Sequence, residues 1–134
     1  MKRLVIILAM FLGTVMGAKA QSFTVKLDGE VPEEAAAVLL QRVTQILEGG
    51  DFTVTEDAKD TVWVYPNVVE YMTTPGSISQ SVLVLDVKAA FGEVEETFSV
   101  KGVGKNNQDA WLRACKQVLP RSRQAQEFIR KLKQ

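Results

Sequence analysis

The segment from residue 83 to residue 100 constrains the fold most, because it reads as two strands joined by a tight turn. The apolar residues that alternate along its two halves are Leu83, Leu85, Val87, Ala89 and Phe91, then Val94, Phe98 and Val100. Gly92-Glu93 separates the halves and has the Gly-first form of a two-residue hairpin turn. Because alternation is the period of a strand with one buried face, the turn fixes the register. The predicted pairs are Phe91 with Val94, Val87 with Phe98, and Leu85 with Val100.

The chain before this hairpin predicts a strand, a helix and a second strand. Residues 22–27 alternate with the period of a strand, and Pro32 suits the first turn of a helix that Gly49-Gly50 would end. The apolar stripe predicted for this helix consists of Ala36, Leu39, Leu40, Val43 and Leu47. Residues 52–54 begin the second strand. This order predicts a right-handed crossover between parallel neighbours.

A third strand is predicted from Thr61 to Thr74, a segment rich in Val and aromatic residues. Pro66 lies inside it and indicates an interruption or bulge, and an edge position or a strand end. Residues 73–80, with Pro75-Gly76, read as a polar connection to the hairpin.

Two helices are predicted after the hairpin. Asn106 or Asn107 would cap the first, which Pro120 ends, and Ser122 would cap the second. Their predicted inner stripes are Ala110, Trp111, Ala114, Cys115 and Val118, then Ala125, Phe128, Ile129 and Leu132. The sequence therefore predicts an α+β fold of order β-α-β-β-β-(β)-α-α. We expect one mixed sheet of four to five strands with helices packed mainly on one face.

Residues 1–20 read as a cleavable signal peptide. Lys2 and Arg3 precede an uncharged apolar run from Leu4 to Gly17, and Ala18-Lys19-Ala20 forms a cleavage site. The mature chain would start at Gln21, form a single domain over residues 21–134 and contain no transmembrane segment. We therefore expect an exported protein, either periplasmic or secreted.

Charge is unevenly distributed along the predicted domain. Residues 21–100 carry 4 basic and 14 acidic side chains, whereas residues 101–134 carry 9 basic and 2 acidic ones. This asymmetry fits basic helices lying over an acidic sheet, or a tail for an anionic partner. Cys115 is the single cysteine, so no intramolecular disulfide can form, and its position in a helical stripe indicates burial.

The residue types required by common reaction centres are missing or badly placed. The chain has no His and no Gly-x-Ser-x-Gly motif. Glu95 and Glu96 are adjacent in a predicted strand and would therefore point to opposite faces. The sequence predicts no catalytic residues, no metal site and no cofactor.

Two segments remain as candidate binding sites. Trp63 and Tyr65 would share the open face of the sheet if Val62 and Val64 face the helices, and with Tyr71 they could bind a peptide, a sugar or a partner protein. The alternative is that a loop covers these aromatics or that the strand is buried on both sides. Gly102, Gly104 and Lys105 lie between a strand and a helix and could bind an anion, although they match no complete phosphate-loop motif. The alternative there is a flexible strand-to-helix corner.

The stretch Phe98-Ser99-Val100-Lys101-Gly102-Val103-Gly104, with Asp109-Ala110 and Ala114 after it, resembles a pattern in small exported envelope modules. These are the domains of curli-secretion-channel, flagellar-assembly-accessory and penicillin-binding-protein-activator proteins. The resemblance implies a Gram-negative envelope setting and a role through protein contacts, and it transfers no site residue.

The sequence therefore favours a non-catalytic envelope protein that acts as a protein-binding or assembly module, with an envelope protein as partner and no nucleic acid. One alternative is a small hydrolase or inhibitor that acts on envelope polymers. Another is a surface anchor that uses the basic helix over residues 121–134, which could also be a plain closing helix.

Overall fold

The computed structural model describes residues 21–74 and 80–134. Three helices and five strands follow in the order β1 (Ser22–Leu27), α2 (Glu33–Gly49), β2 (Thr53–Val54), β3 (Asp60–Thr74), β4 (Gln80–Phe91), β5 (Val94–Gly104), α3 (Asn107–Lys116) and α4 (Arg123–Leu132). The predicted signal peptide and Pro75-Gly76 lie outside the described residues.

The five strands form one mixed sheet in the order β2-β1-β3-β4-β5. β1 runs parallel to both β2 and β3, which confirms the predicted parallel pairing of the two strands that α2 connects. The hairpin of β4 and β5 has the predicted register, with Phe91 opposite Val94, Val87 opposite Phe98, and Leu85 opposite Val100. Gly92 has φ of 61°, the left-handed conformation that this turn requires of its first residue.

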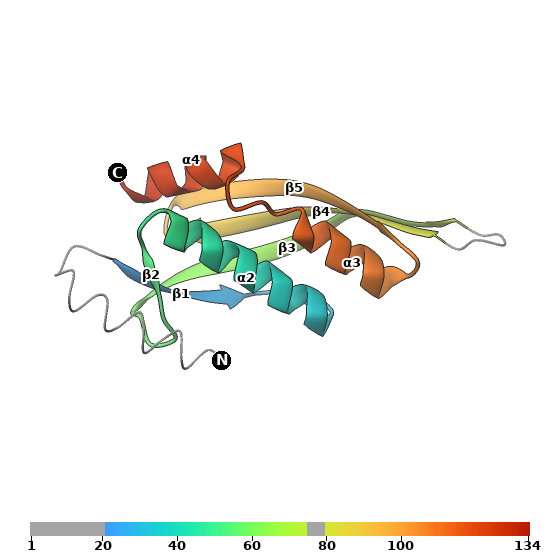
Figure 1. Ribbon diagram of the computed structural model, residues 1–134, viewed down its shortest axis with the longest axis horizontal. Helices are drawn as coiled ribbons and strands as arrows, with labels where there is room; N and C mark the ends of the chain where they lie inside the picture. Colours follow the sequence, from blue (N-terminus) through green and yellow to red (C-terminus); the bar gives the residue numbers. More distant parts are fainter. Residues whose placement is uncertain (1–20, 75–79) are drawn as a thin grey trace.

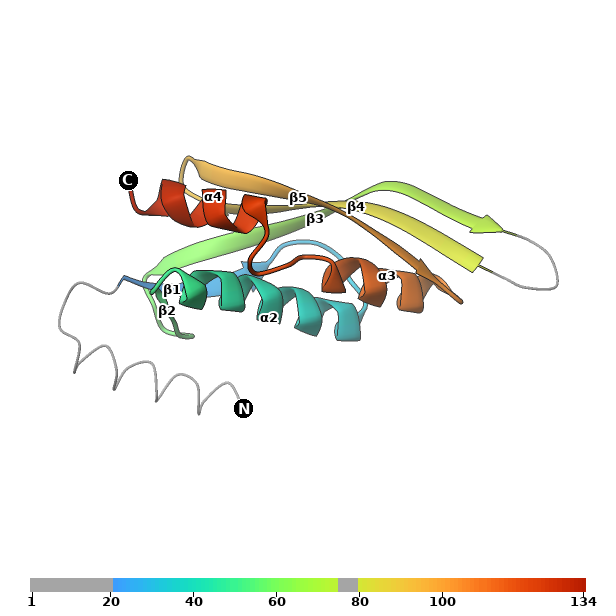
Figure 2. The ribbon, with the colours of Figure 1, turned by 45° about the horizontal axis from the view of Figure 1, so that its top comes forward.

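All three helices lie on one face of the sheet (Figure 1). α2 packs against β1 and β2 beside α3, α3 covers one end of β4 and β5, and α4 covers the other end of β5 next to the hairpin turn (Figures 1 and 2). The α+β class and the one-sided packing are therefore confirmed. No helix of residues 21–74 and 80–134 combines the length and apolar character that crossing a membrane takes.

The core lies between the sheet and the helices. Fully buried side chains from the sheet include Phe23, Val62, Val64, Leu85 and Val87. Phe23 also makes edge-to-face contacts with Phe52 and Phe91, with ring centroids 5.2 and 5.1 Å apart. All five residues of the stripe predicted for α3 are buried, but α3 ends at Lys116, so Val118 lies after the helix and the predicted end at Pro120 is wrong.

The predicted stripe of α2 is wrong at two positions. Ala36 and Leu40 are only partly buried, whereas Ala35 and Ile46 are buried. Residues 35–40 are all apolar, so spacing within that run does not define one face.

Pro66 lies where β3 changes from an interior strand to an edge strand. β1 pairs with β3 only as far as Leu27 opposite Val64, while pairing with β4 continues through Pro66 to Thr74. The Asp28 amide donates to the Val64 carbonyl at 2.9 Å, so alternate residues from Val64 onwards turn their backbone groups to the β1 side. The missing N–H of Pro66 is thus on the side where pairing has ended. The predicted edge position applies only beyond Val64, and the bulge lies between Val68 and Glu70.

Candidate binding surface

The first half of β3 places two aromatic side chains on the open face of the sheet. Val62 and Val64 are fully buried towards the helices, so Trp63 and Tyr65 point the other way. Trp63 is 38% exposed and Tyr65 is partly buried. In the part of the chain that the structure describes, no helix covers this face (Figures 1 and 2).

Each aromatic ring has a lysine over it from a neighbouring strand. Lys26 Nζ lies 5.9 Å from the centroid of the Trp63 ring, and Lys88 Nζ lies 5.1 Å from that of Tyr65. The register explains both pairs, because Lys26 is opposite Trp63 and Lys88 is opposite Tyr65. Such a contact contributes about 0.5–1 kcal/mol at an exposed site. The surface therefore offers apolar rings beside positive charge.

The sequence alone did not identify these two lysines as part of the surface. Their alternation marked them as residues of the open face, but the order of the strands decides which aromatic each one meets. That order depends on tertiary packing, so composition and spacing do not reveal it.

Tyr71 lies on the opposite face of β3 from Trp63 and Tyr65. The bulge after Val68 adds one residue, which puts Tyr71 opposite Leu83 on the helix side of the sheet. The Tyr71 hydroxyl lies 3.3 Å from Ser81 Oγ and accepts a hydrogen bond from Thr73 Oγ1 at 3.2 Å. These contacts, first with Ser81 and then with Thr73, lower the pKa of the phenol. The three predicted aromatics therefore do not form one surface.

The second half of β3 is unusually apolar for an exposed strand. β3 and β4 run beyond the helices as a projecting arm (Figure 2), and every residue of 67–74 is exposed. The large apolar side chains there that are 44–55% exposed are Val68, Val69, Tyr71 and Met72. Of these residues, only Tyr71 was predicted as a binding residue, although the apolar Val68, Val69 and Met72 beside it also indicate an exposed apolar strand.

Gly102 and Gly104 lie within β5, under α3, and not in a corner after the strand. A Cβ on Gly102 would stand 2.0 Å from the Ala110 carbonyl oxygen and 2.4 Å from the Ala114 nitrogen. A Cβ on Gly104 would stand 2.7 Å from the Ala110 nitrogen. Both glycines therefore let a helix backbone approach a strand closely.

The backbone amide at Lys105 already has an anionic partner within the chain. It donates to Asp109 Oδ2 at 3.0 Å, and the Asp109 amide donates to Asn106 Oδ1 at 2.9 Å. The Lys105 hydrogen bond, together with the charge of Arg113, lowers the pKa of Asp109. An external anion at this helix start would have to compete with that carboxylate.

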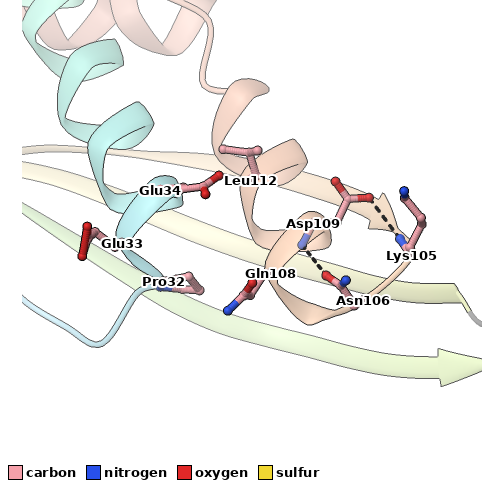
Figure 3. A pocket seen from close by; sticks show the side chains of 8 residues that line it. All are labelled: Pro32, Glu33, Glu34, Lys105, Asn106, Gln108, Asp109 and Leu112. Atoms are coloured by element: carbon pink, nitrogen blue, oxygen red, sulfur yellow. Dashed lines mark hydrogen bonds between the residues drawn. The ribbon is translucent and has the colours of Figure 1, made fainter.

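A hollow of about 460 Å³ lies between the starts of α2 and α3 (Figure 3). Its lining residues are Pro32, Glu33, Glu34, Lys105, Asn106, Gln108, Asp109 and Leu112. The lining carries three carboxylates and one lysine, and it is open to solvent. Within residues 21–74 and 80–134, no three His, Cys, Asp or Glu side chains are grouped so that they could hold a metal ion.

The basic C-terminal helix is part of the core. Ala125 and Phe128 of α4 are buried, and Ile129 packs beside them. Lys131 Nζ lies 3.3 Å from Glu96 Oε2 and donates to the Glu95 carbonyl at 3.2 Å. The basic helix α4 thus lies over the acidic Glu96 of the sheet. The Glu95 side chain points to the opposite face, where its Oε2 lies 3.9 Å from Lys88 Nζ.

Comparisons with known proteins identify no family. No protein-family model matches the chain, and no curated protein matches its sequence. Among solved structures, a minor lipoprotein from Acinetobacter baumannii superposes with a TM-score of 0.44 and 14% sequence identity. The alignment covers 84% of this chain and 91% of the lipoprotein. A likeness at this level has no bearing on function.

Proposed function

We propose that this protein is exported to the cell envelope and acts there, without catalysis, as a protein-binding or assembly module. The proposal combines the signal-peptide pattern of residues 1–20 with the surface of β3. The binding element would be β3, and the partner would be an envelope protein.

One observation carries the proposal. Seven large hydrophobic side chains are exposed among the described residues, and five of them belong to β3: Trp63, Val68, Val69, Tyr71 and Met72. Single exposed hydrophobics are ordinary, but a series of them on one element is typical of an interaction surface. The element is also held by β4, which pairs with it from Trp63 to Thr74 except at the bulge.

The apolar stripe of α4 supports protein binding over the anchor alternative. A helix that lies on a membrane inserts its apolar stripe among the lipids. Phe128 is 0% exposed and Ala125 is 1% exposed, so the centre of this stripe packs against the core and is not available to lipid.

Site-specific crosslinking in living cells tests this proposal. A photoreactive phenylalanine analogue replaces Trp63 or Val69 in the full chain, and replaces Leu119 in the control, which is an exposed apolar residue outside β3. We expect a discrete covalent adduct with one envelope protein at the β3 positions and none at Leu119. The same adducts at all three positions, or none on β3 in protein that remains folded, would refute the proposal.

The export step has its own measurement. Mass spectrometry of protein from the envelope fraction should give an N-terminus at Gln21. Uncleaved protein confined to the cytosol would contradict this part.

A further inference from the structure

The second half of β3 has one unpaired edge. β4 pairs with it on one side, and β1 ends opposite Val64 on the other. From Asn67 to Thr74, no strand of the described residues lies on the β1 side. This free edge is about 26 Å long at the usual rise of a strand.

Backbone groups along this free edge are available for pairing. The Val64 carbonyl faces the β1 side, so the backbone groups of Pro66 and Val68 face the same side by alternation. Pro66 has no N–H, so it leaves no unpaired donor there. The bulge then shifts the alternation by one residue. Tyr71 and Thr73 therefore turn their N–H and C=O groups to the free edge.

The free edge has only part of the usual protection against pairing. Natural sheets protect edge strands with charged side chains, prolines, β-bulges or a covering loop. Of these features, the free edge has the bulge between Val68 and Glu70. Residues 67–74 contain no proline, and Glu70 is their one charged residue. The exposed Val68, Val69, Tyr71 and Met72 would contact alternate side chains of an added strand.

An acidic segment lies at the inner end of the free edge. Asp28 bonds to Val64 through its backbone, and a Cβ on Gly29 would stand 3.2 Å from Pro66 Cγ. The chain then continues beside the middle of β3 to the start of α2 (Figures 1 and 2). Asp28, Glu30, Glu33 and Glu34 are all exposed, and residues 27–41 contain no Lys or Arg.

We propose that the free edge of β3 binds an extended segment of another polypeptide, which adds to the sheet as a strand. The segment would carry apolar side chains in alternation and Lys or Arg at the end that lies beside Asp28–Glu34. This inference rests on the proposed function, because it gives the partner's chemistry at the same strand.

Charge favours a basic segment of another protein over a second copy of the chain as the strand bound to the free edge. Two copies joined through their free edges would bring Glu70 and the acidic segment of each towards the other. Like charges at a contact are unfavourable, whereas a basic segment gains from the same groups.

Defined peptides test the mode of binding with protein purified from cells that express the full chain. The probe alternates Val and Thr and carries two Lys at its N-terminus or, in a second version, at its C-terminus, since an added strand can run either way. Control peptides carry two Glu in place of the Lys, or a central Pro that removes a ladder N–H. We expect one of the Lys peptides to bind about tenfold more tightly than its Glu counterpart. The Pro peptide should not bind.

Hydrogen exchange measured by NMR locates the peptide. On binding, the amides of Tyr71 and Thr73 should exchange at least tenfold more slowly, because they would gain ladder hydrogen bonds. The amide of Leu119 should not change.

A charged variant tests the free edge directly. Val69→Lys places a positive charge where a basic, apolar segment would lie, and Leu119→Lys adds the same charge at a site of similar exposure away from β3. We expect Val69→Lys to abolish peptide binding and Leu119→Lys to preserve it, with unchanged circular dichroism in both.

Several outcomes would overturn this inference. They are equal binding of the Lys and Glu peptides, equal binding by the two lysine variants, or protection of other amides instead. A dimer that Val69→Lys dissociates would replace the foreign segment with a second copy. If no peptide protects Tyr71 and Thr73 but crosslinks at Trp63 persist, strand addition fails while the proposed function stands. If peptides bind but no envelope protein crosslinks to β3, the proposed function fails instead.

Discussion

Replacing Gly102 with Ala should strongly destabilise the protein. The added Cβ would stand 2.0 Å from the Ala110 carbonyl oxygen, whereas ordinary van der Waals contact begins at 3.4 Å. The obstructing atoms belong to the backbone of α3, so no side-chain rotation can relieve the clash. The helix must instead move away from β5 by more than an ångström.

That movement separates surfaces that are now in full contact. Ala110, Ala114 and Cys115 on the facing side of α3 are each 0% exposed. Forcing one carbon into a packed interior costs about 1–3 kcal/mol and sometimes more. Because a whole helix is displaced, we expect a loss of about 3 kcal/mol, a large part of the roughly 5–15 kcal/mol that stabilises a typical domain.

Urea unfolding followed by circular dichroism measures the loss. With an ordinary dependence on denaturant, the midpoint should fall by about 2 M urea. Gly49→Ala is the matched control, since a Cβ there meets nothing within 4 Å and the residue ends α2. That variant should be unchanged or up to about 1 kcal/mol more stable. If Gly102→Ala unfolds at the same urea concentration as the control, close packing of α3 on β5 is not the reason for a glycine at position 102.

Three further perturbations have expected outcomes. Burial raises the pKa of the Cys115 thiol to about 11, so at pH 8 a thiol reagent should modify the native protein at least 100-fold more slowly than the unfolded chain. The unfolded thiol ionises at a lower pH than the folded one. Stability should therefore fall as the pH rises from about 8.5 towards 11, and this part of the slope should be missing in Cys115→Ala. Asn106→Ala removes the side-chain acceptor for the Asp109 amide and should cost about 1 kcal/mol in thermal unfolding, whereas Asn107→Ala should cost clearly less. Phe128→Ala empties a fully buried site under α4 and should cost about 3–5 kcal/mol; a loss below 1 kcal/mol would mean that α4 is dispensable for the core.

Local patterns in the sequence predicted the hairpin and the helix caps. The turn at Gly92-Glu93 and the alternation around it agree, and both place Phe91 and Phe98 on the same face of the hairpin. The Ser122 side chain accepts from the Ala125 amide as predicted, because capping depends only on residues three positions apart.

Features that depend on contacts across the fold were not predictable. The face on which Tyr71 lies depends on a bulge after Val68, and no Gly or Pro marks that bulge. The glycines of β5 resembled an anion-binding loop in the sequence, but their surroundings show a helix backbone packed against them. The pairing of Lys26 with Trp63 required the order of the strands.

The candidate surface was predicted in part. Val62 and Val64 face the helices, and the sequence then correctly places Trp63 and Tyr65 on the open face. The free edge could not be anticipated, because it arises where β1 stops and β3 continues.

The two ends of the described domain both contribute to its centre. β1 lies inside the sheet between β2 and β3, and α4 closes the core through Phe128. A growing chain that still lacks α4 would leave the apolar side of β5 open to water. Completion of the core therefore requires α4, so folding of the described domain cannot finish before this helix has been synthesised.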